Sequence, residues 1–479
     1  GLLAALGLAS AAAAATWTGA GTDDNWTTAA NWGGTAPAPG AALTFAGSAR
    51  TAPVNDFAAG TAFGGVTFAA DAAPFTLSGQ ALSLSGTTDN SSATAQTFAL
   101  PTTFTKDAVL DAKAGDLVFA APFALDVATS EGRVYKCGPH DLVFIGAHAF
   151  ANANPRVVLQ NGGLRFAPGS SFRWTGPSSG NRFSLDVQPN APDRRLHFVV
   201  EEGAEVWFPN ITVFSSAHGN LSGSTFDMVV DGRLSLYNGD TDFGDQAGSN
   251  ITLTVGRSGD FYANWFSMGT RTPQTTTVDG GRFTVDSAAF GRHIGTGDRP
   301  GRNTFLLHAG QVVVSNYFGT MSTFSPTVEN RMVFGNGVRD GATFESVPFT
   351  RAGTTRTGQV LLAFDGAEIV TRRATGNGVD FFGGTEAKEV LAGGFIFRAD
   401  YQTDVVGALT HGAALPDGVR DGGITKRGPE SLTLRDRPTV NGPVRVEEGR
   451  LSFYTAPPAD MCALYMAPGT MFNLKNNGD

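Results

Sequence analysis

The sequence predicts an all-β protein, a right-handed parallel β-helix with a β module at its amino-terminal end. The chain of 479 residues is rich in Gly (62) and Phe (36), and only 16% of its residues are charged. Such a composition is typical of many short strands joined by tight turns. From about residue 131 an apolar strand, a turn at glycine and an alternating strand recur. A period between 20 and 50 residues indicates a solenoid.

Residues 1–15, GLLAALGLASAAAAA, form an apolar run that ends in small residues. We expect a truncated signal peptide here, with cleavage near Ala15. A short buried helix is the alternative. No later segment carries the ~20 apolar residues that span a bilayer. The sequence therefore predicts an exported protein without a transmembrane segment.

Residues 16–130 are expected to form the amino-terminal β module, continuous with the repeats that follow. Its opening stretch, TWTGAGTDDNWTTAANW, places three of the six tryptophans close together. Trp26 and Trp32 could stack on sugar rings, with Asp24 and Asn31 binding hydroxyl groups. Alternatively the rings pack over the first coil, and their indole N–H groups bond to turn carbonyls. Packing is the favoured interpretation, because a solenoid end has unpaired edges that must be covered.

Residues 131–479 contain the clearest repeats. The turn glycines Gly203, Gly232, Gly259 and Gly281 lie 29, 27 and 22 residues apart. Around Gly232, alternation predicts that Val229, Leu234 and Leu236 face one way. Since one such hairpin cannot bury its apolar face, coils must stack, with Phe and Val in interior ladders. A propeller fits this period less well.

The two ends of the chain resemble bacterial autotransporter-associated β-strand repeat proteins. One resemblance lies in residues 16–86, from TWTGAGTDDNW to LSLSG, and the other in residues 422–453, GGITKRGPESLTLRDRPTVNGPVRVEEGRLSF. In the second copy Lys426, Gly428, Leu432, Leu434 and Gly449 fall on the family pattern, whereas Pro429 and Glu430 replace a common glycine. The resemblance implies a secreted or surface-displayed bacterial β-helix, mostly of unassigned activity.

Asp240, Asp242 and Asp245 alternate in the stretch NGDTDFGDQ. Alternating carboxylates on a loop can bind Ca²⁺, which prefers hard oxygen ligands. The EF-hand pattern fails, because Ser249 occupies the position of the closing Glu. A solvated turn is the favoured interpretation, and no cofactor is expected.

Arg292, His293, Asp298 and Arg299 are gathered in the stretch FGRHIGTGDRPGRN. On the side of a β-helix such a group could neutralise a uronate and abstract its proton. The plain alternative is a soluble Gly/Pro loop. No serine-hydrolase, zinc-protease, P-loop or dinucleotide motif is present, and we expect no enzyme activity.

The sequence leads to one functional expectation and two rivals. We expect an exported bacterial surface scaffold or adhesin whose partners are polysaccharides or neighbouring surface proteins. A net charge of −9 argues against nucleic acid, which requires a basic face. The rivals are a polysaccharide lyase or glycoside hydrolase on the same fold, and a self-associating surface-layer protein. Export would permit a disulfide between Cys137 and Cys462, but spacing leaves their pairing open.

Overall fold

A computed structural model describes residues 13–105, 107–126, 133–150, 156–176, 184–214, 223–243, 250–268, 273–290, 303–321, 329–352 and 359–474. The only helical segment in these ranges is a short 3₁₀ turn, η1 (Ala29–Trp32), and the paired strands run parallel. The expected all-β parallel β-helix is confirmed. The chain divides into two compact units: Gly1–Val187, Arg194–His197 and Gly203–Phe208 form unit 1, and Gln188–Asp193, Phe198–Glu202 and Pro209–Asp479 form unit 2.

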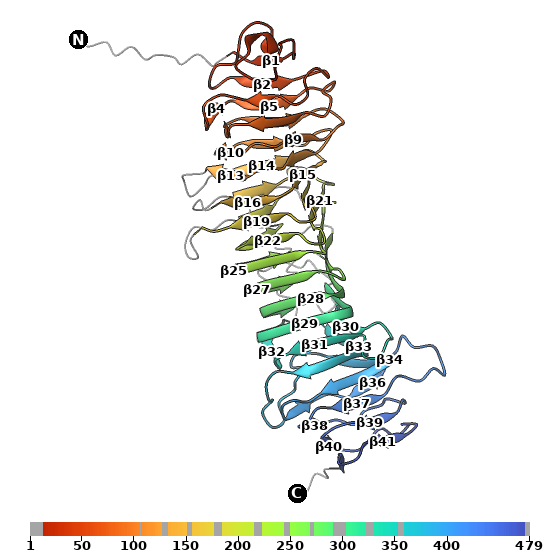
Figure 1. Cartoon of the computed structure of the whole chain (residues 1–479). Helices are drawn as coiled ribbons and strands as arrows, with labels where there is room; N and C mark the ends of the chain where they lie inside the picture. Colours follow the sequence, from red (N-terminus) through yellow and green to blue (C-terminus); the bar gives the residue numbers. More distant parts are fainter. Residues whose placement is uncertain are drawn as a thin grey trace, which may run out of the picture. The chain divides into compact units, whose positions relative to one another are not determined.

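Strand β1 pairs with β2, and from β2 onward unit 1 has three strands in each coil, each pairing with the third strand after it (Figure 1). Val66 lies beside Thr88, and Thr88 beside Leu110, so these coils advance by 22 residues. The first side contains β1 (Ala15–Trp17), β2 (Ala42–Phe45), β5 (Gly65–Phe68), β8 (Thr87–Asn90), β11 (Val109–Asp111), β14 (Arg133–Cys137), β17 (Arg156–Leu159) and β20 (Ser184–Val187).

The other two sides of unit 1 repeat in the same way. The second contains β3 (Val54–Asn55), β6 (Thr76–Gly79), β9 (Gln96–Phe98), β12 (Leu117–Phe119), β15 (Asp141–Phe144) and β18 (Gly162–Phe166), followed along the chain by β21 (Arg195–Val200). The third contains β4 (Thr61–Phe63), β7 (Leu82–Leu84), β10 (Thr102–Thr105), β13 (Phe123–Asp126), β16 (Ala147–Phe150), β19 (Ser171–Trp174) and β22 (Glu205–Phe208). Since β11 pairs with β14 and β12 with β15, the coils before and after residue 130 stack on one another.

Unit 2 has longer strands that bend at the corners of the coil. Its first part contains β23 (Asn210–Val213), β24 (Thr225–Val230), β25 (Arg233–Phe243), β26 (Asn250–Val255), β27 (Asp260–Met268), β28 (Gln274–Phe290), β29 (Asn303–Met321), β30 (Glu329–Gly335), β31 (Ala342–Ser346), β32 (Phe349–Ala352) and β33 (Gln359–Thr371). Its last part contains β34 (Ala387–Arg398), β35 (Thr403–Val405), β36 (Leu409–His411), β37 (Ile424–Arg427), β38 (Ser431–Leu434), β39 (Val444–Val446), β40 (Arg450–Phe453), β41 (Leu464–Met466) and β42 (Met471–Leu474).

The predicted glycine turns are corners of these coils. A Cβ on Gly310 would lie 2.2 Å from the main-chain oxygen of Gly281, so a side chain has no room where one corner stacks on the next. At the corner that contains Gly281, the residue with the left-handed backbone conformation is its neighbour Gly280, which has φ 103°. From β28 onward several corners fall inside continuous strands, which differs from the separate hairpins that the alternation suggested.

The interior of each unit is filled by ladders of apolar side chains. Phe98, Phe119, Phe144 and Phe166 occupy one position in four successive coils, and neighbouring ring centroids lie 5.2, 5.8 and 5.1 Å apart. This stacking explains the excess of Phe, since each ring buries a large apolar area against the next. The expected interior ladders are therefore confirmed.

One predicted orientation is wrong. Leu234 and Leu236 are buried, but Val229 is half-exposed, and its neighbours Met228 and Val230 face the interior instead. Burial alternates without a break from Met228 through Gly232 to Leu236, so even-numbered residues face the interior on both sides of the turn and Val229 faces outward.

Candidate functional site

The tryptophans at the amino-terminal end form a buried cluster. Trp17, Trp26 and Trp32 are 1%, 0% and 6% exposed. Trp32 meets Trp17 edge-on at 5.2 Å and Trp26 at 6.1 Å, and it packs on Phe45 at 5.7 Å. The indole N–H of Trp32 donates to the carbonyl of Trp26 at 2.7 Å. Buried rings present no face to a sugar, so the rings pack as the second interpretation expected and the stacking platform at Trp26 and Trp32 is wrong. The expected bond from each indole N–H to a carbonyl is wrong for Trp26, whose Nε1 has no partner in the described part of the chain.

The two polar residues assigned to the same glycan site have internal partners. Asn31 is fully buried, and its amide donates to the carbonyls of Asp23 and Asn25, both at 3.0 Å. Its oxygen accepts from the N–H of Gly21 at 2.8 Å. Asp24 forms a 3.0 Å ion pair with Arg50. These contacts hold the loops of the cap together.

The other predicted site residues fall partly or wholly beyond the described ranges. Arg292, His293, Asp298 and Arg299 lie outside the described residues, and so does Asp245. Asp240 and Asp242 lie in strand β25, paired with Trp265 and Ser267, rather than on the expected loop; their side chains are not described. Within the described part of the chain, no three His, Cys, Asp or Glu side chains are grouped to hold a metal ion.

A buried lysine at the repeat motif links neighbouring coils. The ammonium group of Lys426 donates to the carbonyls of Arg427, Gly428 and, one coil later, Glu448, at 2.6, 2.7 and 3.1 Å. It is 0% exposed. Burial lowers its pKa to about 8, against the attraction of Glu448 and other carboxylates.

The same arrangement recurs in unit 1, where our sequence analysis missed it. Lys136 donates to the carbonyls of Cys137, Gly138 and Asn161 at 2.7, 2.9 and 2.9 Å. Aligning KCGPHDLVF at Lys136 with KRGPESLTL at Lys426 would have shown the shared K-x-G-P motif. Both lysines satisfy buried carbonyl groups, and they are structural residues.

A chain of charged side chains crosses adjacent coils of unit 1. His197 Nε2 lies 2.7 Å from Asp141 Oδ1, and Arg165 lies 3.7 Å from Asp141 and 3.4 Å from Asp116. His140 approaches Asp116 at 3.9 Å. A Cβ on Gly163 would lie 2.1 Å from His197 Nε2, so only glycine leaves room for this imidazole.

The electrostatics of this cluster favour an ionised Asp141. Burial alone would raise the pKa of Asp141, but the hydrogen bond and charge of His197 and the charge of Arg165 bring it below its usual value of 3.8. A carboxylate that orients an imidazole is the geometry of a general base. These residues come from separate coils, and their convergence could not be read from spacing.

A second polar surface lies on unit 2, where three coils form an open depression of about 340 Å³ lined by Arg233, Ser235, Asp260, Tyr262, Arg282 and Thr284. The residues project from β25, β27 and β28, and none was singled out from the sequence. A signal was present, because Arg233, Asp260 and Arg282 each follow a turn glycine. Aligning the repeats on that glycine places them in one column.

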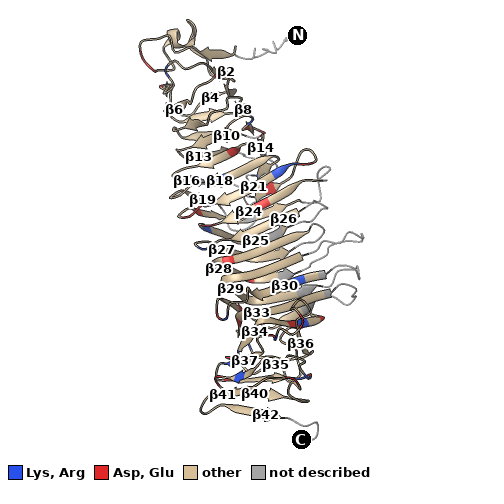
Figure 2. Cartoon of the chain, turned by 90° about the vertical axis from the view of Figure 1, so that its right-hand side faces the viewer, with Lys and Arg blue, Asp and Glu red and all other residues tan. Residues whose placement is uncertain are grey.

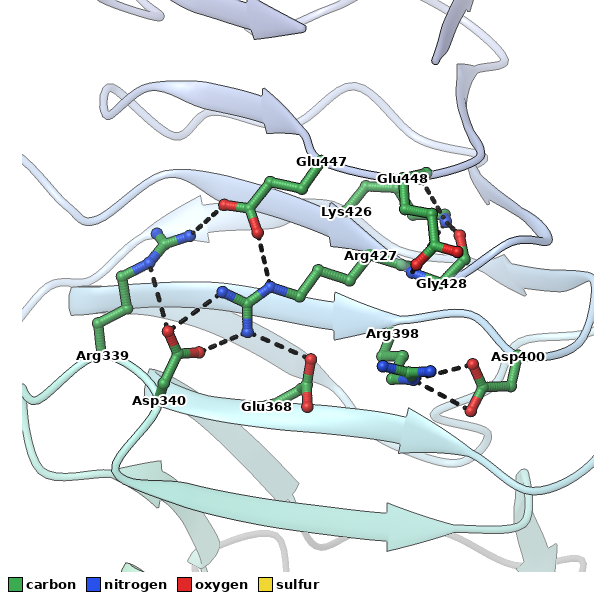
Figure 3. A network of polar contacts seen from close by, with 10 residues as sticks. All are labelled: Arg339, Asp340, Glu368, Arg398, Asp400, Lys426, Arg427, Gly428, Glu447 and Glu448. Atoms are coloured by element: carbon green, nitrogen blue, oxygen red, sulfur yellow. Dashed lines mark hydrogen bonds and ion pairs between the residues drawn. The ribbon is translucent and has the colours of Figure 1, made fainter. Parts of the chain in front are cut away.

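An ion-pair network occupies another outward face of unit 2 (Figure 3). Arg427 donates to Glu447, Asp340 and Glu368 at 2.7, 2.5 and 3.2 Å, and Arg339 reaches Glu447 at 3.0 Å. Hydrogen bonding to Arg427 lowers the pKa of Asp340. All these groups are paired with one another, so the network binds coils together.

Charged residues of both signs are interspersed along the strands, and most of the ribbon is uncharged (Figure 2). In the described residues no helix is of a length and hydropathy that would cross a membrane. Cys137 and Cys462 are both free thiols, the first half-buried and the second exposed. Comparisons with protein families, with curated proteins and with solved structures found no match.

Proposed function

We propose that the protein is an exported bacterial surface scaffold or adhesin without catalytic activity. The observation that carries this proposal is the stacking of parallel coils around continuous Phe ladders. In such a stack each outward side chain is repeated about 4.8 Å further along by the next coil. Repeated polar faces suit many weak contacts, whose combined affinity exceeds that of any single contact.

The resemblance to autotransporter-associated β-strand repeats supports export and surface display. Its motif residues Lys426 and Gly428 have equivalents in Lys136 and Gly138, where the lysine makes the same three kinds of bond. A motif with this role is a signature of coil architecture. The motif carries no information about a partner, because a partner would contact the outward-facing side chains.

The test combines location and binding. Intact producing cells are treated with protease, and loss of the protein without lysis is the expected result for surface display. Purified protein is then incubated with neutral and acidic polysaccharides, and both retained protein and newly formed sugar ends are measured. Retention without new ends supports the adhesin. A protein found only inside intact cells contradicts the proposal, and concentration-dependent assembly without any ligand favours the surface-layer rival.

One observation favours a second candidate, a carbohydrate-active enzyme. The pair His197–Asp141 with Arg165 and Asp116 is the kind of cross-coil constellation that a lyase or hydrolase on this fold requires. If new sugar ends form, His197→Gln and Asp141→Asn should abolish them while leaving far-UV circular dichroism unchanged. New ends that persist in both variants would exclude this cluster as their source.

A further inference from the structure

The depression on unit 2 is a regular grid of side chains. Arg233 of β25 lies beside Asp260 of β27, which lies beside Arg282 of β28. Two residues further along each strand, Ser235 lies beside Tyr262 and Tyr262 beside Thr284. Residues two apart on a strand share a face, so these side chains project to the same side. Three neighbouring coils therefore present one row of charges and one row of hydroxyl groups.

The charge row has an excess of guanidinium groups. Arg233 and Asp260 approach each other at 3.6 Å, and their side chains are 51% and 43% exposed. Arg282 is exposed, and the described part of the chain shows no ion pair or side-chain hydrogen bond to its guanidinium. An unpaired guanidinium has five N–H donors in a planar fork, which matches a carboxylate with two parallel bonds.

In the hydroxyl row, the side chain of Tyr262 is oriented by a hydrogen bond. The hydroxyl of Tyr262 donates to Asp286 Oδ2 in the next coil at 2.8 Å. Burial, with the hydrogen bond to Asp286 and its negative charge, raises the pKa of Tyr262 to about 12. The phenol therefore stays protonated at neutral pH, and its oxygen keeps lone pairs for a ligand hydroxyl. On one side of it Ser235 has a hydroxyl group that both donates and accepts, whereas the hydroxyl of Thr284 on the other side is buried.

Together these groups select the chemistry of the ligand. The guanidinium of Arg282 would bind an anionic group of the ligand, and Asp260 would accept hydrogen bonds from hydroxyl groups of the same ligand. A ligand with carboxylates and many hydroxyls satisfies both rows, whereas a bare polyanion would be repelled by Asp260. The volume of about 340 Å³ is at the lower end of the range for ligand pockets, and the depression is open, as a polymer passing through it requires.

We infer that this groove, formed by Arg233, Asp260, Tyr262 and Arg282, binds an acidic polysaccharide through its uronate carboxylate and neighbouring hydroxyls. The inference rests on the proposed adhesin function and names its ligand class. The carboxylate pairs with Arg282, and the sugar hydroxyls bond to Asp260 and Tyr262.

Titration calorimetry of the full chain with polygalacturonate tests the inference. Arg282→Ala should weaken binding about 10-fold or more, since bonds to charged groups contribute strongly. Arg282→Lys should recover only part of the loss, because it keeps the charge and loses the fork. Tyr262→Phe, which keeps the ring, should cause a smaller loss. The matched control is Arg420→Ala, which removes another exposed arginine that does not line the groove. Circular dichroism and the thermal midpoint verify that each variant is folded.

Several results would overturn the inference. They are unchanged binding by Arg282→Ala, an equal loss in Arg420→Ala, and equally tight binding of polyglutamate, dextran sulfate or a neutral glucan. If the protein binds the neutral glucan and Arg282→Ala does not change that binding, the proposed role of the groove is wrong, but the adhesin proposal still stands. A protein that binds no polysaccharide overturns the groove, and if it is also absent from the cell surface the adhesin proposal fails with it.

Discussion

Lys426 donates a hydrogen bond of 3.1 Å to the main-chain oxygen of Glu448, which belongs to the next coil. With two further bonds inside its own turn, this buried ammonium group joins two coils that are also linked by strand pairing and by the ion pair of Arg427 with Glu447. Lys136 does the same in unit 1. We therefore predict that the lysine of this repeat motif stabilises the stacking of neighbouring coils.

Replacing either lysine should destabilise the coils that it joins. Lys136→Met removes the ammonium donor from three carbonyls, of which that of Cys137 keeps the N–H of Ala112 as a donor. The loss costs about 1–3 kcal/mol. Urea unfolding followed by circular dichroism measures the midpoint. The control is Lys113→Met, which removes an exposed lysine of the same unit. Equal midpoints for the two variants would show that the three bonds contribute nothing.

The same lysines predict a dependence of stability on pH. Burial lowers the pKa of Lys136 to about 8, whereas its ordinary value is 10.5. Between these two pH values the unfolded chain binds more protons than the folded chain, so the free energy of unfolding rises with pH. Below pH 8 the cost of burying the charge is fully present. Unfolding midpoints at pH 7 to 10 should therefore increase for the wild type relative to Lys136→Met; a constant difference would contradict the shift.

Two glycines with similar backbone angles separate strain from crowding. Gly428 has φ 78° and Gly378 has φ 75°. A Cβ would lie 2.6 Å from the oxygen of Ala399 at Gly428, but would meet nothing within 4 Å at Gly378. We expect Gly378→Ala to cost about 1–2 kcal/mol through its angle alone, and Gly428→Ala to cost clearly more. Thermal midpoints of both variants decide the matter, and equal losses would mean that crowding is relieved by a shift of the backbone.

The tryptophan cluster should matter for stability and not for glycan binding. Trp26→Ala removes a ring that is 0% exposed, and substitutions of this kind cost about 3–5 kcal/mol. Limited proteolysis should show earlier cleavage in the first coils, while retention on polysaccharide stays unchanged. Trp265→Ala, at a half-buried ring on β27, is the comparison. If Trp26→Ala loses retention on polysaccharide but keeps normal protease resistance, the tryptophans bind sugar and the prediction is wrong.

The network around Arg427 should contribute little, although it has more ion pairs than any lysine site. Arg427 and Glu368 are 23% and 19% exposed, but Asp340 and Glu447 are 46% and 41% exposed. Pairs open to solvent in this way contribute about 0–1 kcal/mol. Arg427→Ala should shift the unfolding midpoint slightly, and molar salt should remove the difference. A large shift that persists in salt would show that the network acts as a buried one.

Much of the fold could be predicted because it is encoded locally. Alternation after each turn glycine places Leu234 and Leu236 inside, and a ladder of Phe in successive coils follows from repeating the pattern. The orientation of Val229 was predicted wrongly because the prediction shifted the alternation at Gly232, whereas the structure continues it unbroken from Met228 to Leu236. The groove residues Arg233, Asp260 and Arg282 were visible as a column after glycine, but polar residues in such columns usually face solvent without a role.

The sequence by itself determined the class of architecture, since glycine spacing and two-residue alternation are sufficient to require stacked coils. Tertiary structure decided which outward residues meet. The step between coils varies from 19 residues, between Leu432 and Leu451, to 34, between Phe172 and Val206, so no constant period aligns them. The contact of His197 with Asp141, the burial of Trp26 and the row from Arg233 to Arg282 all depend on register. Register is set by how whole strands fit against the coil below, and that fit is a property of the folded stack.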